Sequence, residues 1–363
     1  MQVLLVGEAP EIAASVHALP VPMGVELVRA PTPEEGIARL ARDPFDLVID
    51  AATPGAWLLD QVRANWPGAA RVAVLPPLSA PSVSSLRSAH QLLASRPSPR
   101  EVHELVIGLQ RARALLDGPE LARLVGAIDS LPAMPQTSAQ LAGLLRDDDV
   151  PLETVARVIE RDPGTAAKVL QVVNSAYYRG QAEIRSIHLA ACRLGLRALS
   201  RVVLAAEIGE WSGHAAPVAG LDAAEVSRRS ARAARIAAQL AADLDLPGDA
   251  VTPALLADLG PILLGLVAPR RLATMLSQVP PSREDERLAD HLAGYLLGTW
   301  GVPSDLVDAV AHLGEPTAVE RSVGIVSVAY VATRLVRGAT PTPDAVPAPG
   351  RDRLWLRAGL RAG

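Results

Sequence analysis

The sequence predicts two folded units, an α/β unit with a parallel sheet in residues 1–116 and an all-helical unit after it. Three observations support this prediction. Short apolar runs alternate with amphipathic helical patterns over the first 116 residues, as in βα repeats. Beyond about residue 119, long segments rich in Ala and Leu replace the strand-length runs. The chain has 363 residues, well above the roughly 150 residues expected for one domain.

Uninterrupted apolar runs are typical of strands that are buried on both faces of a parallel sheet. Three such runs are predicted to be strands, at residues 3–6, 46–49 and 71–75. Two helix starts are also marked in this unit. Thr32-Pro33 and Ser98-Pro99 each place a capping hydroxyl before a first-turn proline, and a glutamate follows at the capping-box position.

The second half has the pattern of a helical bundle. Asp162-Pro163 is predicted to begin a helix with apolar residues at helical spacing, and glycines punctuate the later helices. We expect residues 117–130 to form a connection and residues 131–337 to form the helical unit. Residues 338–363 lose periodicity and gain Pro and Gly, so they are predicted to be a mobile tail.

Composition limits the functional classes. Hydrophobic residues make up 49% and charged residues 20%, so the chain has enough apolar material to fold. The net charge of −4 disfavours nucleic acid and anionic membranes as partners.

Cys192 is the single cysteine, which excludes a disulfide or a Cys-based metal cage, and we expect it to be buried in a helix. The N-terminus lacks a basic leader and no run is long enough to span a membrane, so a cytoplasmic location is expected.

The α/β unit carries motifs at three predicted strand ends, namely Val6-Gly7-Glu8-Ala9-Pro10, Asp50-Ala51-Ala52-Thr53-Pro54-Gly55 and Ser95-Arg96-Pro97-Ser98-Pro99. With the βα layout, they resemble the flavodoxin-like receiver domain of two-component response regulators. That resemblance places Asp50 at the phosphate-accepting position and Glu8 at the Mg²⁺-binding acidic pair.

The phosphorylation chemistry of this receiver-like unit is incomplete in the sequence. The resemblance implies a hydroxyl at the end of the fourth strand and a lysine at the end of the fifth, where this chain has Leu75 and Ser95. Phosphoryl transfer needs fixed positive charge beside the phosphoryl oxygens. We therefore expect a degenerate receiver used for contact. A phosphorylation-switched response regulator stays as an alternative, in which Arg96 would have to supply the missing cation.

The helical unit carries a longer series of ordered motifs. They are Leu131-Pro132-Ala133-Met134-Pro135, Ile159-Glu160-Arg161-Asp162-Pro163, Val173-Asn174-Ser175-Ala176-Tyr177-Tyr178, Ile184-Arg185-Ser186-Ile187 and Arg193-Leu194-Gly195-Leu196. In order and spacing they resemble the HDOD domain, an all-helical relative of the metal-dependent HD phosphohydrolases that is found in bacterial signalling proteins.

That resemblance implies a degenerate metal site. An HD hydrolase uses a histidine, a His-Asp pair and a later aspartate, and the matching positions here are Arg229, Ala257-Asp258 and Tyr330. Only Asp258 is kept, and Arg229 adds a cation that opposes metal binding. An ion pair between Arg229 and Asp258 is therefore predicted, without metal or cofactor. A residual metal-dependent phosphohydrolase that uses Asp258, His291 and His312 is the alternative.

Arginines recur at helical spacing in two places, which predicts one-sided cationic stripes. The stripes comprise Arg228, Arg232 and Arg235, and Arg193, Arg197 and Arg201. Each is a solvated face or a docking stripe for an acidic protein, a nucleotide second messenger or, least favoured, nucleic acid. The sequence thus predicts a non-catalytic signal-transduction adaptor that contacts other signalling proteins. A small polar interface between the units would permit rearrangement, and a large apolar seam would indicate a rigid scaffold.

Overall fold

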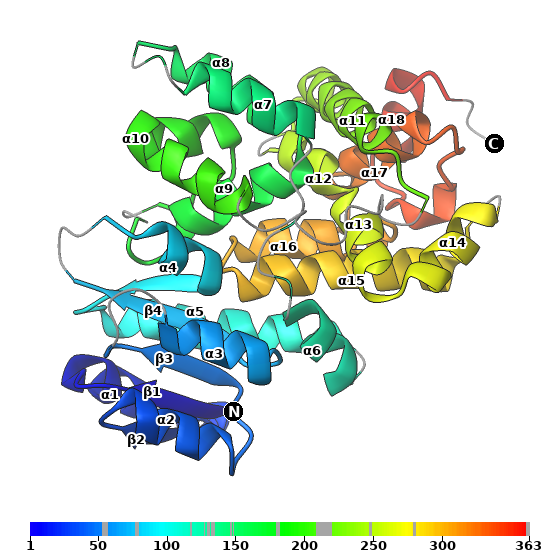
Figure 1. Cartoon of the computed structure of the whole chain (residues 1–363). Coiled ribbons are helices and arrows are strands. Elements are labelled where there is room, and N and C mark those ends of the chain that lie inside the picture. Colours follow the sequence, from blue (N-terminus) through cyan, green and yellow to red (C-terminus); the bar gives the residue numbers. More distant parts are fainter. Residues whose placement is uncertain are drawn as a thin grey trace.

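The computed structural model describes the chain apart from residues 53–56, 77–79, 117, 127, 129–130, 132–134, 146, 148, 179–181, 208–219, 247–248, 279–280 and 361–363. An α/β unit lies at one end of the molecule and a helical unit covers one side of it (Figure 1). The predicted fold class is confirmed in both units.

The α/β unit contains one parallel sheet with the strand order β2-β1-β3-β4-β5, the flavodoxin-like order. Its strands are β1 Gln2–Val6, β2 Glu26–Ala30, β3 Leu47–Asp50, β4 Ala70–Leu75 and β5 Gln91–Ala94. In the central register Val6 is opposite Asp50, so β1 and β3 end at the same edge. The three predicted strands are present. β2 and β5 were not predicted, because they are short edge strands with polar residues.

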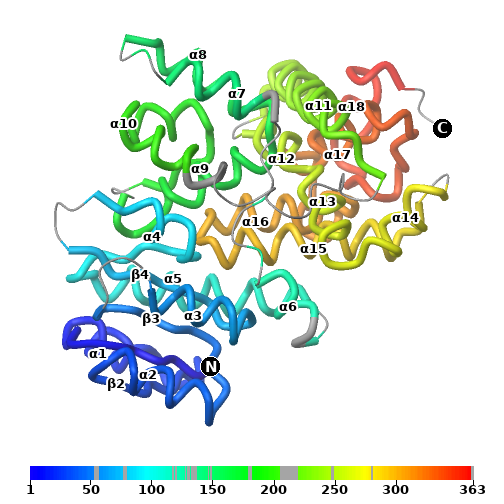
Figure 2. The backbone as a smooth tube through the Cα atoms, viewed as in Figure 1, coloured from blue at the N-terminus to red at the C-terminus, as the bar shows by residue number. Residues whose placement is uncertain are grey.

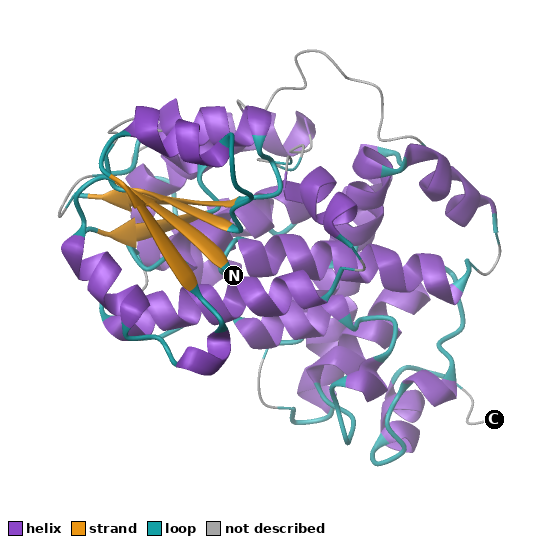
Figure 3. Ribbon diagram, turned by 90° about the horizontal axis from the view of Figure 1, so that it is seen from below, coloured by secondary structure: helices purple, strands orange, loops and turns teal. Residues whose placement is uncertain are grey.

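Helices cover both faces of the sheet (Figure 3). They are α1 Pro10–His17, α2 Pro33–Leu40, α3 Trp57–Asn65, α4 Val83–Ser88 and α5 Pro99–Ala114, with a short 3₁₀ turn at Val21–Met23. Alternate residues of β1 face opposite sides, as strand geometry requires. Val3 and Leu5 pack with α1 and α5, whereas Leu4 and Val6 pack with α2, α3 and α4. Both predicted helix starts are present, and Ser98 with Glu101 forms the capping box of α5.

The helical unit begins after a connecting helix, α6 Pro119–Gly126. Its helices are α7 Pro135–Leu144, α8 Leu152–Ile159, α9 Pro163–Asn174, α10 Ile187–Glu207, α11 Ala223–Asp243, α12 Val251–Leu256, α13 Leu259–Val267, α14 Pro269–Ser277, α15 Arg283–Thr299, α16 Ser304–Ala311, α17 Ile325–Val336 and α18 Arg351–Arg357, with 3₁₀ turns at Pro316–Ala318 and Pro343–Ala345. The Asp162 carboxylate caps α9 by accepting hydrogen bonds from the Gly164 and Thr165 amides, as predicted. Residues 132–134 of the first HDOD motif lie outside the described residues.

The two units share an apolar seam. Side chains of β4, α3 and α4 belong to the same buried cluster as those of α9, α10 and α15. α15 packs closely against α5. A Cβ added at Gly298 would lie only 2.8 Å from the Cβ of Ala112. Lys168, the sole lysine, is buried at the seam and donates to the Leu86 carbonyl at 2.6 Å. The interface between the two units is therefore a large apolar seam and not a small polar contact.

The C-terminal segment is not the mobile tail that the sequence predicted. Residues 338–360 fold back beside α11 and include the helix α18 (Figure 2). Val346, Leu354 and Trp355 are buried there in a core cluster with α11 and α17. The prediction is wrong because it rested on the loss of helical periodicity at the Pro and Gly residues. The few apolar side chains of this segment are nevertheless buried against α11 and α17, which stabilises the segment.

Candidate functional site

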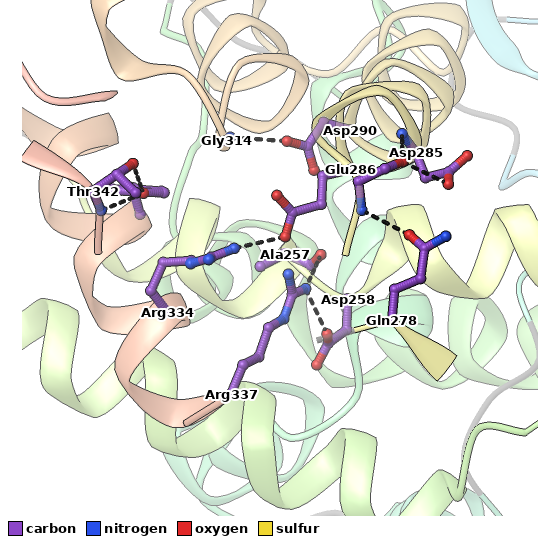
Figure 4. Close-up of polar contacts among 12 residues, drawn as sticks. Ala257, Asp258, Gln278, Asp285, Glu286, Asp290, Gly314, Arg334, Arg337 and Thr342 are labelled. Atoms are coloured by element: carbon purple, nitrogen blue, oxygen red, sulfur yellow. Dashed lines mark hydrogen bonds and ion pairs between the residues drawn. The ribbon is translucent and has the colours of Figure 1, made fainter. Parts of the chain in front are cut away.

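Charged side chains gather in the helical unit around Asp258, the residue that the HD resemblance places at the metal site. We call this set the HD-like charge cluster. It comprises Arg229 from α11, Asp258 before α13, Glu286 and Asp290 from α15, and Arg334 and Arg337 at the end of α17. Figure 4 shows all of these except Arg229 as labelled sticks, with Arg337 directed at Asp258 and Arg334 directed at Glu286. Four separate helical segments thus converge on one charged centre.

Asp258 is the centre of the cluster. Arg229 donates to both carboxylate oxygens, from Nε to Oδ2 at 3.0 Å and from Nη2 to Oδ1 at 3.0 Å. Arg337 donates from Nη2 to Oδ1 at 2.9 Å, and Ser230 donates from Oγ to Oδ2 at 3.3 Å. Each carboxylate oxygen therefore accepts two hydrogen bonds. The ion pair predicted between Arg229 and Asp258 is present, with bidentate geometry.

Burial and charge act in opposite directions on Asp258, which is 2% exposed. Burial disfavours the ionised carboxylate, but the guanidinium groups of Arg337 and Arg229 outweigh it and lower the pKa of Asp258 below its usual value. The carboxylate is thus ionised at neutral pH and is neutralised by arginine. These residues do not fit a metal ion, because two fixed cations already point at the one retained ligand.

Asp290 and Glu286 form a second acidic layer around Arg337. Asp290 accepts a hydrogen bond from the Gly314 amide to Oδ2 at 2.8 Å, and Glu286 accepts one from Arg334 to Oε1 at 2.6 Å. Burial raises the pKa of Asp290 to about 7, against the opposing effects of the Gly314 hydrogen bond and of Arg337. Asp290 is therefore the member of the cluster whose charge changes near neutral pH.

Three further positions were singled out by the HD resemblance, namely Tyr330, His291 and His312. The Tyr330 hydroxyl accepts a hydrogen bond from the Thr342 amide at 3.0 Å, so this residue holds the C-terminal segment against α17. The His291 and His312 rings meet edge to face, with 5.8 Å between centroids. Within the described ranges, no three His, Cys, Asp or Glu side chains are grouped as metal ligands. The metal site of Asp258, His291 and His312 stays the alternative prediction.

Four residues of the cluster were not predicted from the sequence, namely Arg334, Arg337, Glu286 and Asp290. A signal was available, because Glu286 and Asp290 are four residues apart on α15 and Arg334 and Arg337 are three apart on α17. Charges at helical spacing lie on one face of a helix, and opposite charges on two such helices can pair. Nothing in the sequence, however, indicates that these two helices meet Asp258.

The receiver-like edge is defined by the residues at the carboxyl ends of the strands, namely Glu8, Asp50, Leu75 and Ser95. Asp50 is 3% exposed, and its Oδ1 accepts a hydrogen bond from the Ala52 amide at 3.0 Å. Glu8 is exposed and lies 3.9 Å from Arg29. The Thr53-Pro54-Gly55 turn that follows Asp50 lies outside the described residues. The structure thus places a buried carboxylate and an exposed one at this edge.

Arg96 is the candidate replacement for the missing lysine. It lines a cavity of about 490 Å³ at the receiver-like edge, together with Glu8, Glu11 and Ser95. Its side chain is 84% exposed and its Nε lies 3.8 Å from a carboxylate oxygen of Glu11. Arg96 therefore interacts with Glu11 at the rim, where solvent screens its charge.

The two predicted arginine stripes differ in the structure. Arg228, Arg232 and Arg235 are exposed on one face of the continuous helix α11, and Arg228 pairs with Glu225 at 2.6 Å. In α10, Gly195 has φ +70° and interrupts the helix. The prediction that Arg193 shares one helix face with Arg197 and Arg201 is therefore wrong, because the kink lies between them.

Cys192 on α10 is exposed, 3.9 Å from a ring nitrogen of His188, so the expectation of a buried thiol is also wrong. The sequence pattern could not exclude this, because a single small residue can face either side of an amphipathic helix.

Comparison with known proteins gives the following similarities. A family model described as HDOD domain matches residues 131–316, just over half of the chain. A virulence factor from Campylobacter jejuni has a similar fold, with a TM-score of 0.52 and 21% identity, over 67% of this chain and 92% of that one. The MmoQ response regulator from Methylococcus capsulatus is matched with a TM-score of 0.49 and 23% identity, over 64% of this chain and 94% of that one.

A curated relative, an uncharacterized protein of Treponema pallidum (strain Nichols), is 23% identical over 236 residues. The match covers 61% of this chain and 45% of the relative, so it spans about half of the relative's length. In the part of the chain that the structure describes, no helix has both the length and the apolar character needed to cross a bilayer. The protein belongs to the HDOD family, with a receiver-like α/β unit before its helical domain.

Proposed function

We propose that the protein is a non-catalytic bacterial signalling adaptor that acts in the cytoplasm through contacts with other proteins. The observation that carries this proposal is the hydrogen bonding of Asp258 by Arg229 and Arg337. A catalytic divalent cation needs several oxygen or nitrogen ligands and an open position for water. Here the retained carboxylate is already paired with two guanidinium groups, so the site supports a structural role.

The seam indicates how such an adaptor would work. Because the two units share a buried apolar cluster, they would present their surfaces to partners as one rigid scaffold. The exposed stripe of Arg228, Arg232 and Arg235 on α11 is a candidate contact surface. Its chemistry favours an acidic partner protein, since exposed guanidinium groups form paired hydrogen bonds with carboxylates.

The absence of catalysis can be tested on the full chain. We expect purified protein to contain no stoichiometric Mn²⁺ or Fe by elemental analysis, and to show no turnover in a phosphodiesterase and nucleotidase panel with added metal. Stoichiometric metal, with turnover that is lost in His312→Gln, would establish the phosphohydrolase alternative. His312 is outside the HD-like charge cluster, so this variant separates lost catalysis from lost folding.

The contact surface needs a second test. Full-length protein would be used to capture partners from the native cell, in parallel with Arg232→Glu/Arg235→Glu and with Arg39→Glu/Arg42→Glu as a control of equal charge change on the α/β unit. We expect an acidic partner to be retained by the control and lost with the α11 variant. Equal capture by both variants would contradict a role for the α11 stripe.

A further inference from the structure

A cavity of about 470 Å³ lies on the seam between the two units. One wall comes from β5 and from α5 along most of its length, and the other comes from residues 298–308, where α15 ends and α16 begins, with Asn174, Ala176 and Glu183 at one side. Its interior is largely apolar and includes Leu93, Leu105, Val302, Pro303 and Val307. This volume falls in the range of sites that bind small molecules, roughly 300–1,000 Å³.

Gly108 accounts for the space inside the cavity. It lies in the middle of α5 and lines the cavity, and a Cβ built there would meet no heavy atom within 4 Å. One turn later Ala112 is in close contact with Gly298, so α5 touches α15 there and leaves a gap at Gly108. Glycine is unfavourable inside a helix. The space that a larger side chain at position 108 would fill is therefore part of the cavity.

The charges around the cavity are mainly negative. Its lining includes the carboxylates Glu101, Glu104, Glu183 and Asp308, and a single guanidinium, Arg111. Arg111 is already paired with Asp308 at 2.7 Å.

Two further arginines lie outside the lining and each bind one of these carboxylates at 2.8 Å, Arg100 with Glu104 and Arg185 with Glu183. Arg185 also pairs with Asp305 at 2.6 Å. Carboxylates still outnumber guanidinium groups when both arginines are counted. An anionic ligand would therefore meet net repulsion.

We propose that this cavity binds a small, mainly apolar molecule that carries one cationic group. The apolar body would contact Leu93, Leu105 and Val307, and the cation would lie toward the carboxylates of Glu101 and Glu104. Such a ligand would contact both units at once, and so would stabilise their seam by binding the folded chain. The same charges make the cavity unsuitable for a nucleotide second messenger, whose phosphates would lie against carboxylates.

Three probes of one shape test the proposal on the full chain, by ligand-observed NMR titration. They are benzamidine, which is cationic, benzamide, which is neutral, and benzoate, which is anionic. We expect benzamidine to bind at least about tenfold more tightly than benzoate, with benzamide between them, because opposite charges at short range favour association. Equal affinities for the three, or tightest binding of benzoate, would overturn the proposal.

Cavity-filling variants locate the binding. Gly108→Phe and the smaller Gly108→Leu place a side chain in the open space, and each is expected to abolish benzamidine binding. Gly143→Phe is the matched control, because Gly143 is an exposed helical glycine of α7 that also has nothing within 4 Å of a built Cβ. Thermal unfolding of each variant shows whether it is folded. Undiminished binding in a folded Gly108 variant, or equal loss in the control, would place the ligand elsewhere and reject the site.

Glu101→Gln/Glu104→Gln tests the charge. The double variant keeps the shape of both side chains, and we expect it to weaken benzamidine severalfold while leaving benzamide unchanged. An unchanged preference for benzamidine over benzamide would contradict the proposed role of these carboxylates. These outcomes do not depend on whether the protein is an adaptor.

Discussion

The receiver-like edge and the HD-like charge cluster differ in how their central carboxylates are surrounded. At the receiver-like edge Asp50 is a buried carboxylate, and Leu75 and Ser95 end the neighbouring strands. In the HD-like charge cluster the buried carboxylate of Asp258 is paired with the guanidinium groups of Arg229 and Arg337. Fixed positive charge therefore lies directly on Asp258, whereas the arginine at the receiver-like edge, Arg96, lies at the exposed rim.

This difference has an energetic consequence. Coulomb energies grow as the surrounding dielectric constant falls, so a buried ion pair interacts more strongly than an exposed one. Asp258 is buried and its two arginines are partly buried, whereas Glu8 and Arg96 are exposed to solvent. We therefore expect the HD-like charge cluster to contribute to folding and the charges at the receiver-like edge to contribute little.

The largest effect is expected for Asp258→Ala. Removal of this carboxylate leaves Arg229 and Arg337 facing each other in a mostly buried site, which should lower the free energy of unfolding by about 3 kcal/mol. Chemical denaturation measures the change. The comparison is Glu8→Ala at the receiver-like edge, for which we expect a change of less than about 0.5 kcal/mol. Equal effects of the two substitutions would show that the sites do not differ as described.

The next largest effect on stability is expected at the apolar seam between the α/β unit and the helical unit. Gly298→Leu would force a side chain against Ala112, and we expect it to lower the free energy of unfolding by about 2 kcal/mol. Gly143→Leu is the matched control, because its Cβ enters open space. A tolerated Gly298→Leu would mean that α5 and α15 can separate, and would favour movement of the two units.

Asp290 gives the stability contribution of the HD-like charge cluster a pH dependence. The ordinary pKa of aspartate is 3.8 and the folded value is about 7, so between these values the folded chain binds a proton that the unfolded chain has released. This contribution favours folding at low pH and disappears as the pH rises through 7. Relative to Asp290→Asn, the wild type should lose about 1 kcal/mol of unfolding free energy between pH 5.5 and 8, with partial exposure reducing the full effect.

Denaturation curves of the two proteins at several pH values measure that difference. The substituted amide can still accept the Gly314 hydrogen bond, so the comparison isolates the titration. Parallel pH profiles would show that Asp290 titrates normally.

The smallest effect is expected at Asp50. Incubation with acetyl phosphate should give no base-labile phosphate on the protein, because Ser95 stands where the stabilising lysine would be. Mass spectrometry of the intact chain measures incorporation, with Asp50→Asn as the control. Stoichiometric labelling that disappears in Asp50→Asn would restore the phosphorylation-switched alternative and remove the contrast between the two sites.

Features that depend on residues close together in the chain could be predicted from the sequence alone. The three apolar strands and the caps at Thr32, Ser98 and Asp162 follow from local hydrogen bonding and side-chain period, and all are present. The order and spacing of the motifs in the helical unit predicted the HDOD family, which is confirmed. The edge strand β2 was missed because Glu26 and Arg29 give it the polarity of a loop.

Tertiary structure decided the features that depend on residues far apart in the chain. The sequence predicts the pairing of Arg229 with Asp258, but it does not show that Arg337 approaches the same carboxylate from the end of α17. It also could not show that α5 packs on α15, or that Leu354 is buried in what looked like a tail. The physical reason is that local patterns determine which face of a segment is apolar or charged, whereas the partner of that face depends on how the whole chain is packed.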